Sequence, residues 1–260
     1  TAAQVKIYVN GALITTAAYS NAIGVDNKPV CVGAFQSLNG TYNFTGSIDE
    51  VAIRNRALPV AEILAEYAAG AVTQANLGLN ATGDRVLHAK LNEALGATTF
   101  EDSSDSHRTG ICRASTVGTT GACPTTAVAG VSDSAAQFAG GTSNTIVSFP
   151  DTTGSNLDLT DRISVEAWIY STVAVNGNKR IVEKDYISSW AFTAGTLNNS
   201  LTVYLKGVAV ASTVAEVIKL NKWSHLVFTY DKAAGEVKIY VDGVLVKTAA
   251  YTQALGVDNK

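Results

Sequence analysis

Charged residues are scarce in this 260-residue sequence, and no segment concentrates them. Lys, Arg, Asp and Glu together make up 16% of the chain, the formal net charge is −3, and no run of Lys and Arg occurs. Proteins that bind nucleic acid carry a basic patch that neutralises phosphate groups. We therefore expect no nucleic-acid partner.

A long apolar run is also missing. A membrane-spanning helix needs about 20 consecutive apolar residues, and no stretch of this sequence approaches that length. The overall content of hydrophobic residues, 47%, is nevertheless typical of globular proteins. We expect a globular chain with a full hydrophobic core and without a membrane span.

Cysteine is rare, and methionine is absent. None of the cysteines forms the Cys-x-x-Cys pattern of a zinc site. Cys112 and Cys123 flank a stretch rich in Thr, Gly and Ala, and we predict a disulfide between them, with two free thiols as the alternative. Such a bridge indicates a location outside the cytoplasm. Cys31 lies in an apolar run, where a buried thiol is expected.

The common catalytic patterns are missing too. The three histidines, His88, His107 and His225, are not at metal-ligand spacing with one another, so neither zinc binding nor general-base catalysis is favoured. No phosphate-binding loop, His-Glu-x-x-His motif or ordered Ser/His/Asp set occurs. We expect a protein that is not an enzyme.

The main positive feature is an internal repeat. Residues 1–28 recur as residues 233–260 without a gap, and eighteen of the twenty-eight positions are identical. This self-similarity indicates a tandem array with a 232-residue period. We predict that residues 1–70 are the C-terminal part of one repeat, that residues 71–84 are a linker, and that residues 85–260 are the N-terminal and central part of the next repeat.

Each copy of the repeated segment predicts a β-hairpin. Apolar and polar residues alternate on both sides of Asn10-Gly11 in the first copy and of Asp242-Gly243 in the second. Asn-Gly and Asp-Gly favour the two-residue type I′ turn, because Asn, Asp and Gly tolerate the positive φ that it requires.

The rest of the chain predicts short strands and one helix. Pro59 precedes Val60, Ile63, Leu64 and Tyr67 at helical spacing, which indicates a short helix near residues 59–69. Short alternating segments separated by Gly, Asn and Asp favour an all-β antiparallel sandwich. The main strands are expected near residues 30–33, 42–44, 48–53, 86–91, 135–138, 145–149, 163–170, 180–184, 190–194, 201–206 and 223–230.

Four segments carry a resemblance to a known family. They read WSHLVFTYD at 223–231, VKIYVDG at 237–243, FTGSIDEV at 44–51 and VEAWI at 165–169. When the 232-residue period is rejoined across the repeat boundary, these segments follow the order found in one family, and the sequence resembles laminin-G-like domains of the concanavalin A-like jelly-roll superfamily. The resemblance implies an antiparallel jelly-roll β-sandwich. Two positions depart from the family pattern, Asp105 and Ala139, where glycine and aspartate are usual.

The superfamily also contains glucanases whose catalytic strand reads Glu-x-Asp-x-x-Glu. The nearest match here is Glu183, Asp185 and Ser188, which lacks the third carboxylate. A retaining glycosidase needs two carboxylates about 5 Å apart. We therefore interpret this segment as the end of a strand with solvated charges.

The resemblance further implies a structural calcium ion. In the superfamily, calcium is often held by an aspartate of the last strand together with main-chain carbonyl groups, and Asp49 matches that position. From the alternation of the strand, Asp49 shares a face with Val51 and Ile53, so its carboxylate needs a partner. Calcium at Asp49 is one interpretation. A hydrogen bond or pairing with Arg54 or Arg56 is the other.

Two functions are compatible with these features. The first is a non-catalytic structural or adhesive repeat of an extracellular, bacterial-type surface protein, with neighbouring identical repeats as head-to-tail partners in a filament or stalk. The second is a carbohydrate-binding module that recognises cell-surface or matrix glycans through aromatic residues, for which Tyr42, Tyr186 and Trp190 are the candidates.

The duplicated hairpin also leads to a prediction about assembly. One copy is superfluous in a closed monomer, so we expect residues 1–70 to pair with a neighbouring chain rather than with their own residues 86–232. Such a head-to-tail contact need not close and generates a filament. Pairing of residues 48–53 with residues 86–91 of the same chain would contradict this prediction.

Overall fold

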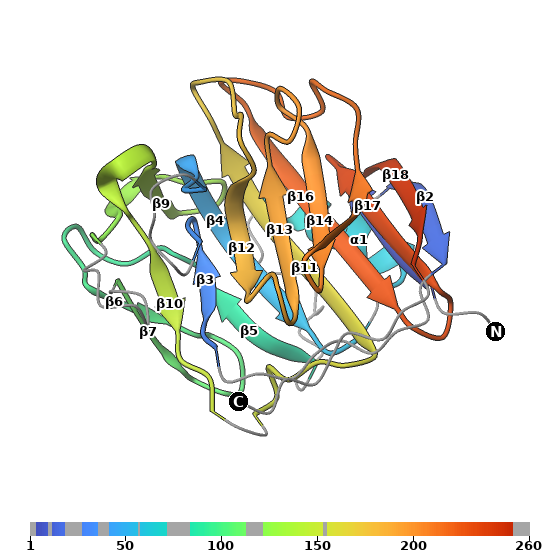
Figure 1. Ribbon diagram of the computed structural model, residues 1–260. Coiled ribbons are helices and arrows are strands. Elements are labelled where there is room, and N and C mark those ends of the chain that lie inside the picture. The colour runs from blue at the N-terminus through green and yellow to red at the C-terminus, as the bar shows by residue number, and fades with distance from the viewer. Residues whose placement is uncertain are drawn as a thin grey trace.

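Most strands of the chain lie in two antiparallel β-sheets that pack face to face in the computed structural model (Figure 1). The residues that the structure describes are 4–9, 12–18, 28–35, 42–56, 58–71, 84–112, 122–152 and 155–251. Alternation of apolar and polar residues along the strands gives each sheet one inward apolar face. The predicted all-β antiparallel sandwich is therefore confirmed.

The front sheet faces the viewer in Figure 1. Its spatial order is β15 (Val208–Ser212), β14 (Leu201–Leu205), β13 (Trp190–Ala194), β12 (Lys179–Lys184), β3 (Val30–Val32), β10 (Val147–Phe149), β7 (Thr109–Ile111) and β6 (Thr99–Glu101).

The back sheet lies behind the front sheet. Its spatial order is β18 (Val244–Ala250), β17 (Glu236–Val241), β16 (Trp223–Asp231), β11 (Arg162–Tyr170), β4 (Thr45–Arg54), β9 (Ser134–Ala139) and β8 (Thr125–Ala129), and β5 (Arg85–Ala89) also pairs with β4.

The N-terminal part of the chain supplies an internal strand to each sheet. β3 lies between β12 and β10 in the front sheet. In the back sheet, β4 pairs with β11 along one edge and with β9 and β5 along the other. The register places Val51 opposite Ala89 and Ile53 opposite Leu87. β3 and β4 are thus inserted between strands that follow them in the sequence.

This pairing contradicts the expectation that residues 1–70 pair with a neighbouring chain. That expectation is wrong for β3 and β4, both of which pair within their own chain. The physical reason is that a tethered strand has a high effective concentration at its own sheet, whereas a strand from another molecule has to be recruited from solution. The division into two repeats and the linker, whose residues 72–83 lie outside the described residues, stay predictions.

One continuous hydrophobic core joins both sheets and both parts of the chain. It includes Val30 and Ile48 from the N-terminal part together with residues as distant as Leu245. Phe228 of the back sheet packs against Phe192 of the front sheet, with ring centroids 5.2 Å apart. Because the two parts share this core, they form one folding unit over the described residues.

The two copies of the repeated hairpin have the same backbone register. β1 (Gln4–Val9) pairs with β2 (Ala12–Ala18), and each of their register partners corresponds to a partner in the β17–β18 hairpin, including one irregularity before Tyr8 and Tyr240. Asp242 and Gly243 both have positive φ, as the predicted type I′ turn requires, whereas Asn10 and Gly11 lie outside the described residues. The first hairpin forms a separate two-stranded sheet beside β17 and β18 (Figure 1).

A helix covers part of the outer face of the back sheet. α1 (Val60–Ala71) matches the helix predicted near residues 59–69. Its Ile63 is fully buried, whereas Leu64, which has the same helical spacing, is 45% exposed. Tyr67 stacks on Trp168 of β11 with ring centroids 5.8 Å apart. None of the helices in the described part of the chain is long and apolar enough to cross a membrane.

Buried charges beneath α1 fix its position on the sheet. Arg54 of β4 donates hydrogen bonds to Glu66 of α1 and to Glu166 of β11, the latter over 2.8 Å. Burial and the neighbouring Glu166 raise the pKa of Glu66 to about 7, and burial lowers the pKa of His225 to about 4. Each buried charge has a partner here, and removal of one partner would leave the other uncompensated.

The predicted disulfide is confirmed. Cys112 and Cys123 are bonded, with Cα atoms 4.8 Å apart, and Cys31 is a buried free thiol. Burial, followed by the nearby charge of Glu183, raises the pKa of Cys31, which keeps this thiol unreactive.

Reduction of the disulfide should lower stability. A bridge that closes a loop of this length stabilises a domain by about 3 kcal/mol, because it restricts the unfolded chain. We expect the Cys112→Ser/Cys123→Ser variant to unfold at lower urea concentration than the oxidised protein, and dithiothreitol to have no further effect on that variant. Equal unfolding midpoints for the oxidised protein and the double variant would contradict this expectation.

Candidate functional site

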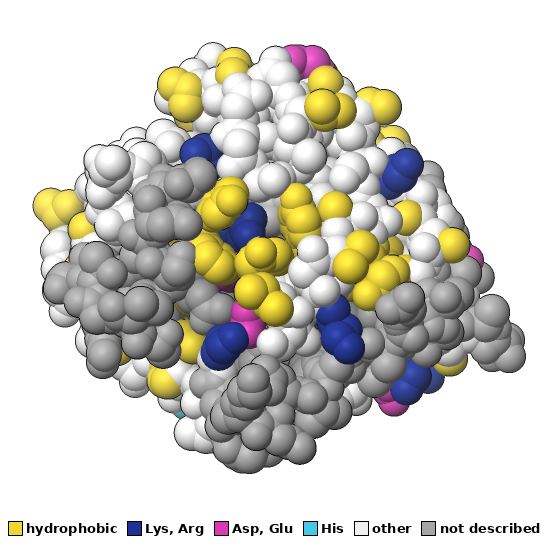
Figure 2. Space-filling model, in the orientation of Figure 1, with side chains coloured by type: hydrophobic (Ala, Val, Ile, Leu, Met, Phe, Trp, Pro, Cys, Tyr) yellow, Lys and Arg dark blue, Asp and Glu magenta, His cyan; other side chains and the backbone are white. Residues whose placement is uncertain are grey.

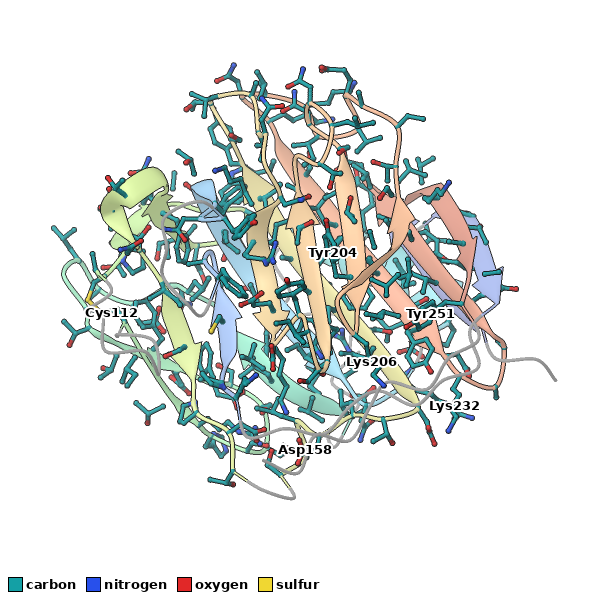
Figure 3. All side chains as sticks on the ribbon, viewed as in Figure 1. Cys112, Asp158, Tyr204, Lys206, Lys232 and Tyr251 are labelled. Atoms are coloured by element: carbon teal, nitrogen blue, oxygen red, sulfur yellow. A yellow bond between two sulfur atoms is a disulfide. The ribbon has the colours of Figure 1, made fainter. Side chains whose placement is uncertain are left out.

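Four aromatic side chains meet on the outer face of the front sheet. Phe35 follows β3, Tyr42 precedes β4, and Tyr186 follows β12. Tyr204 lies on β14 and is labelled in Figure 3. Phe35 contacts Tyr42 and Tyr186 edge to face, with centroids 5.8 and 5.5 Å apart, and Tyr186 contacts Tyr204 at 6.0 Å. We call this group the front aromatic cluster. Its rings are all partly exposed to solvent.

The guanidinium group of Arg180 lies at the centre of the front aromatic cluster. Its central carbon is 4.7 Å from the ring centroid of Tyr42, 5.0 Å from those of Phe35 and Tyr186, and 5.7 Å from that of Tyr204. A cation over an aromatic face is attracted by the ring quadrupole, and the attraction is stronger when the cation is desolvated. Arg180 therefore holds the four rings in place.

The charge of Arg180 is compensated within the sheet. Its Nε donates to Glu183 over 2.9 Å, and its Nη1 donates to the carbonyl oxygen of Asn178 over 3.0 Å. Arg180 is 3% exposed and Glu183 is fully buried. The ion pair removes most of the net charge beneath the rings and leaves an aromatic surface with tyrosine hydroxyl groups.

This surface has the composition of a ligand-binding face. Figure 2 shows hydrophobic side chains gathered around a basic side chain over the front sheet. Partly exposed rings held by a buried charge are preorganised, so a ligand that stacks on them need not order them first. Tyrosine is well suited to this role because it offers both an apolar ring and a polar hydroxyl group.

The structure brings together two of the three aromatic residues that the sequence indicated. Tyr42 and Tyr186 belong to the front aromatic cluster, but Trp190 does not. Trp190 is 1% exposed and packs inward against Phe228, with centroids 5.9 Å apart. Its inclusion was wrong because Trp190 shares the inward face of β13 with Phe192, two residues along the strand.

Three members of the site were missed. Arg180 and Phe35 carried no pattern that marked them, since they meet only when β12 and β3 pair. Tyr204 could have been found, because it lies between the core residues Val203 and Leu205 and so must face outward.

The carboxylates of the glucanase-like segment have cationic partners. Glu183 accepts from Arg180, and Asp185 is ion-paired with Lys28. Both carboxylates are buried, so the interpretation as solvated charges is wrong, because these cations compensate the charges inside the protein. Ser188 stands where the catalytic motif has its third carboxylate. A retaining mechanism uses one free nucleophile and one acid/base carboxylate, and neither carboxylate of this segment is placed to serve as one.

A β-bulge determines where Asp49 lies. Glu50 has a positive φ of 48°, and the register between β4 and β11 shifts at this point. Ile48 belongs to the core, so Asp49 occupies the opposite face of β4, next to the loop that contains Val131. The sequence-based assignment of Asp49 to the face of Val51 and Ile53 was wrong, because the bulge adds one residue between them.

The Asp49 carboxylate is only partly satisfied by protein groups. Its Oδ2 accepts from the Val131 N–H over 2.8 Å, whereas its Oδ1 is buried and has no hydrogen-bond partner among the described residues. Burial raises the pKa of Asp49 to about 7, although the Val131 hydrogen bond opposes this shift. Arg54 and Arg56 pair with other carboxylates. The orphaned oxygen fits a hard cation such as calcium.

Such a cation would depend on main-chain oxygen atoms or water for its other ligands. The described residues contain no group of three or more His, Cys, Asp or Glu side chains that could hold a metal ion. His88 bonds to Glu50 over 2.8 Å and His225 lies beneath α1, so neither histidine is available as a ligand.

The two packed antiparallel sheets have the architecture of a jelly-roll β-sandwich. A laminin-G family model, described as the concanavalin A-like lectin/glucanases superfamily, matches residues 1–64 and 140–260. The chain therefore belongs to this superfamily, and the resemblance found in the sequence is confirmed. Comparisons with curated proteins and with solved structures find no match.

Proposed function

We propose that this chain is a non-catalytic carbohydrate-binding domain that acts outside the cell. The observation that supports this function is the front aromatic cluster, in which four rings surround Arg180 on the open face of the front sheet. The disulfide between Cys112 and Cys123 supports an extracellular location.

A saccharide suits this surface better than a charged ligand. Arg180 is neutralised by Glu183, and Lys28 is paired with Asp185 next to Tyr186. The rings offer apolar faces to the C–H groups of a sugar, and the tyrosine hydroxyl groups can donate to and accept from sugar hydroxyl groups. Without a free carboxylate pair in this segment, the domain binds the glycan without cleaving it.

The front aromatic cluster can be tested by removing its rings. We expect a glycan that binds the wild-type protein on a glycan array to bind the Tyr186→Ala and Tyr204→Ala variants about tenfold more weakly, because each loses a stacking surface. Tyr186→Phe and Tyr204→Phe keep the rings and should lose less. The proposal fails if no glycan binds, or if the alanine variants bind as tightly as the wild-type protein.

We also propose that Asp49 holds a structural calcium ion, which would supply positive charge to the orphaned Oδ1. Asp49 lies at the junction of β4 with the loop at Val131, so an ion there would tie this loop to the back sheet. The chain's own contribution is to bury Asp49 with its Oδ1 outside hydrogen-bond geometry of any described donor.

Calcium should stabilise the native state by an amount that rises with the logarithm of its concentration above Kd. Ligand binding adds RT ln(1 + [Ca²⁺]/Kd) to the free energy of unfolding. We expect the melting temperature of the wild-type protein to fall in chelator and to recover in millimolar calcium. The Asp49→Asn variant should have the same melting temperature in chelator and in calcium. Identical melting of the wild-type protein under the two conditions would disprove the site.

A second candidate function is that of a structural repeat in an adhesive surface protein. The duplicated hairpin supports it, because β1–β2 and β17–β18 share both sequence and register. In this proposal the units are joined head to tail through the covalent chain, and each closes its own sandwich. The resulting stalk or filament would present many copies of the glycan-binding face.

The array can be tested with a protein that contains three consecutive 232-residue periods. We expect electron microscopy to show a string of equal, evenly spaced domains, because each period carries one full set of strands. A single compact particle or irregular spacing would exclude this second candidate and leave the carbohydrate-binding proposal unaffected.

A further inference from the structure

A row of polar and aromatic residues crosses five strands of the back sheet. Thr125 of β8 is the register partner of Gln137 of β9, which is the partner of Ser47 of β4. Ser47 is in turn the partner of Tyr170 of β11, and Tyr170 is the partner of Trp223 of β16. We call these five residues the back row. They come from five separate segments of the sequence, so only the sheet brings them together.

The back row lies on the outer face of the sheet. Its neighbours along the strands, Ile48, Phe138 and Ile169, belong to the core, and successive side chains point to opposite faces. Thr125 and Gln137 are exposed, and Tyr170 and Trp223 are partly exposed. Of the described elements, α1 packs on this face around Trp168 and His225, two residues along the strands from Tyr170 and Trp223.

A groove runs along one end of the back row. It has a volume of about 350 Å³, and Thr125, Gln137, Ser47 and Tyr170 are among its lining residues. Gly46 is also among its lining residues. At the other end of the back row, the ring centroids of Tyr170 and Trp223 lie 5.7 Å apart.

The chemistry of the groove selects a neutral, hydroxyl-rich ligand. None of its described lining residues is acidic or basic, so these residues offer nothing to pair with a phosphate, a carboxylate or an ammonium group. Hydroxyl and amide groups of Thr125, Gln137 and Ser47 can each donate and accept hydrogen bonds, as sugar hydroxyl groups do. The Tyr170–Trp223 pair supplies an apolar platform for a sugar ring.

The dimensions favour an oligosaccharide over a single sugar. Neighbouring strands lie about 4.8 Å apart, so a row across five strands extends over roughly 19 Å. An extended peptide is a poorer fit, because peptides bind sheets by pairing with a free edge, and the backbones of β9, β4 and β11 are already paired on both sides.

We propose that the back row is a second carbohydrate site, which binds a neutral oligosaccharide across the strands. One sugar ring stacks on Tyr170 and Trp223, and the following sugars bond to Ser47, Gln137 and Thr125. This site is on the opposite face of the sandwich from the front aromatic cluster and does not depend on it. A domain with both sites can link two glycan chains.

The test uses the intact protein and neutral hexasaccharides of glucose, xylose and mannose in isothermal titration calorimetry. We expect at least one to bind, and Gln137→Ala and Tyr170→Ala to weaken its binding about tenfold. Tyr170→Phe keeps the ring and should retain most of the affinity. Gln137 is exposed, so its variant remains informative even if Tyr170→Ala does not fold.

A front-site variant separates this proposal from the previous one. Binding at the back row should be unchanged in Tyr204→Ala, and should alter the emission of Trp223, the one tryptophan of the three that is not buried. The proposal is overturned if no neutral hexasaccharide binds, or if Tyr204→Ala weakens binding while Gln137→Ala does not.

Discussion

The insertion of β3 and β4 into the middle of the two sheets is the constraint on which the rest of the structure depends. β3 joins β12 to β10 in the front sheet, and β4 joins β11 to β9 and β5 in the back sheet. Without these two strands each sheet would be divided into two parts with free edges, which are prone to pair with other chains. The single core that spans residues from both parts of the chain follows from this insertion.

Both candidate carbohydrate sites depend on the insertion of β3 and β4. Phe35 and Tyr42 are placed by the ends of β3 and β4, whereas Arg180, Tyr186 and Tyr204 come from the later part of the chain. On the opposite face, Ser47 of β4 is the central member of the back row. The same N-terminal segment therefore completes both faces. Neither candidate site can form unless β3 and β4 are inserted into their sheets.

Much of the fold could be predicted from the sequence, because it depends on local patterns. The alternation in WSHLVFTYD and the Asp242-Gly243 turn are local, and so is the spacing of Ile63 and Tyr67. Features set by distant pairing could not be predicted. The bulge at Glu50 reverses the face of Asp49, and Arg180 meets its four rings only after the strands assemble. Tyr42 and Tyr186 were found by residue type alone, and the same criterion wrongly selected Trp190.

NMR on a mixture of differently labelled molecules measures most directly whether β4 pairs with β11 of its own chain. Ala52 and Glu166 are partners across β4 and β11, so main-chain protons of the two residues lie within range of a nuclear Overhauser effect. If each chain inserts its own β4, this effect arises within one labelled chain and is absent from spectra filtered for contacts between chains. An intermolecular effect between Ala52 and Glu166 would contradict the insertion and show that neighbouring chains complete one another's sheets.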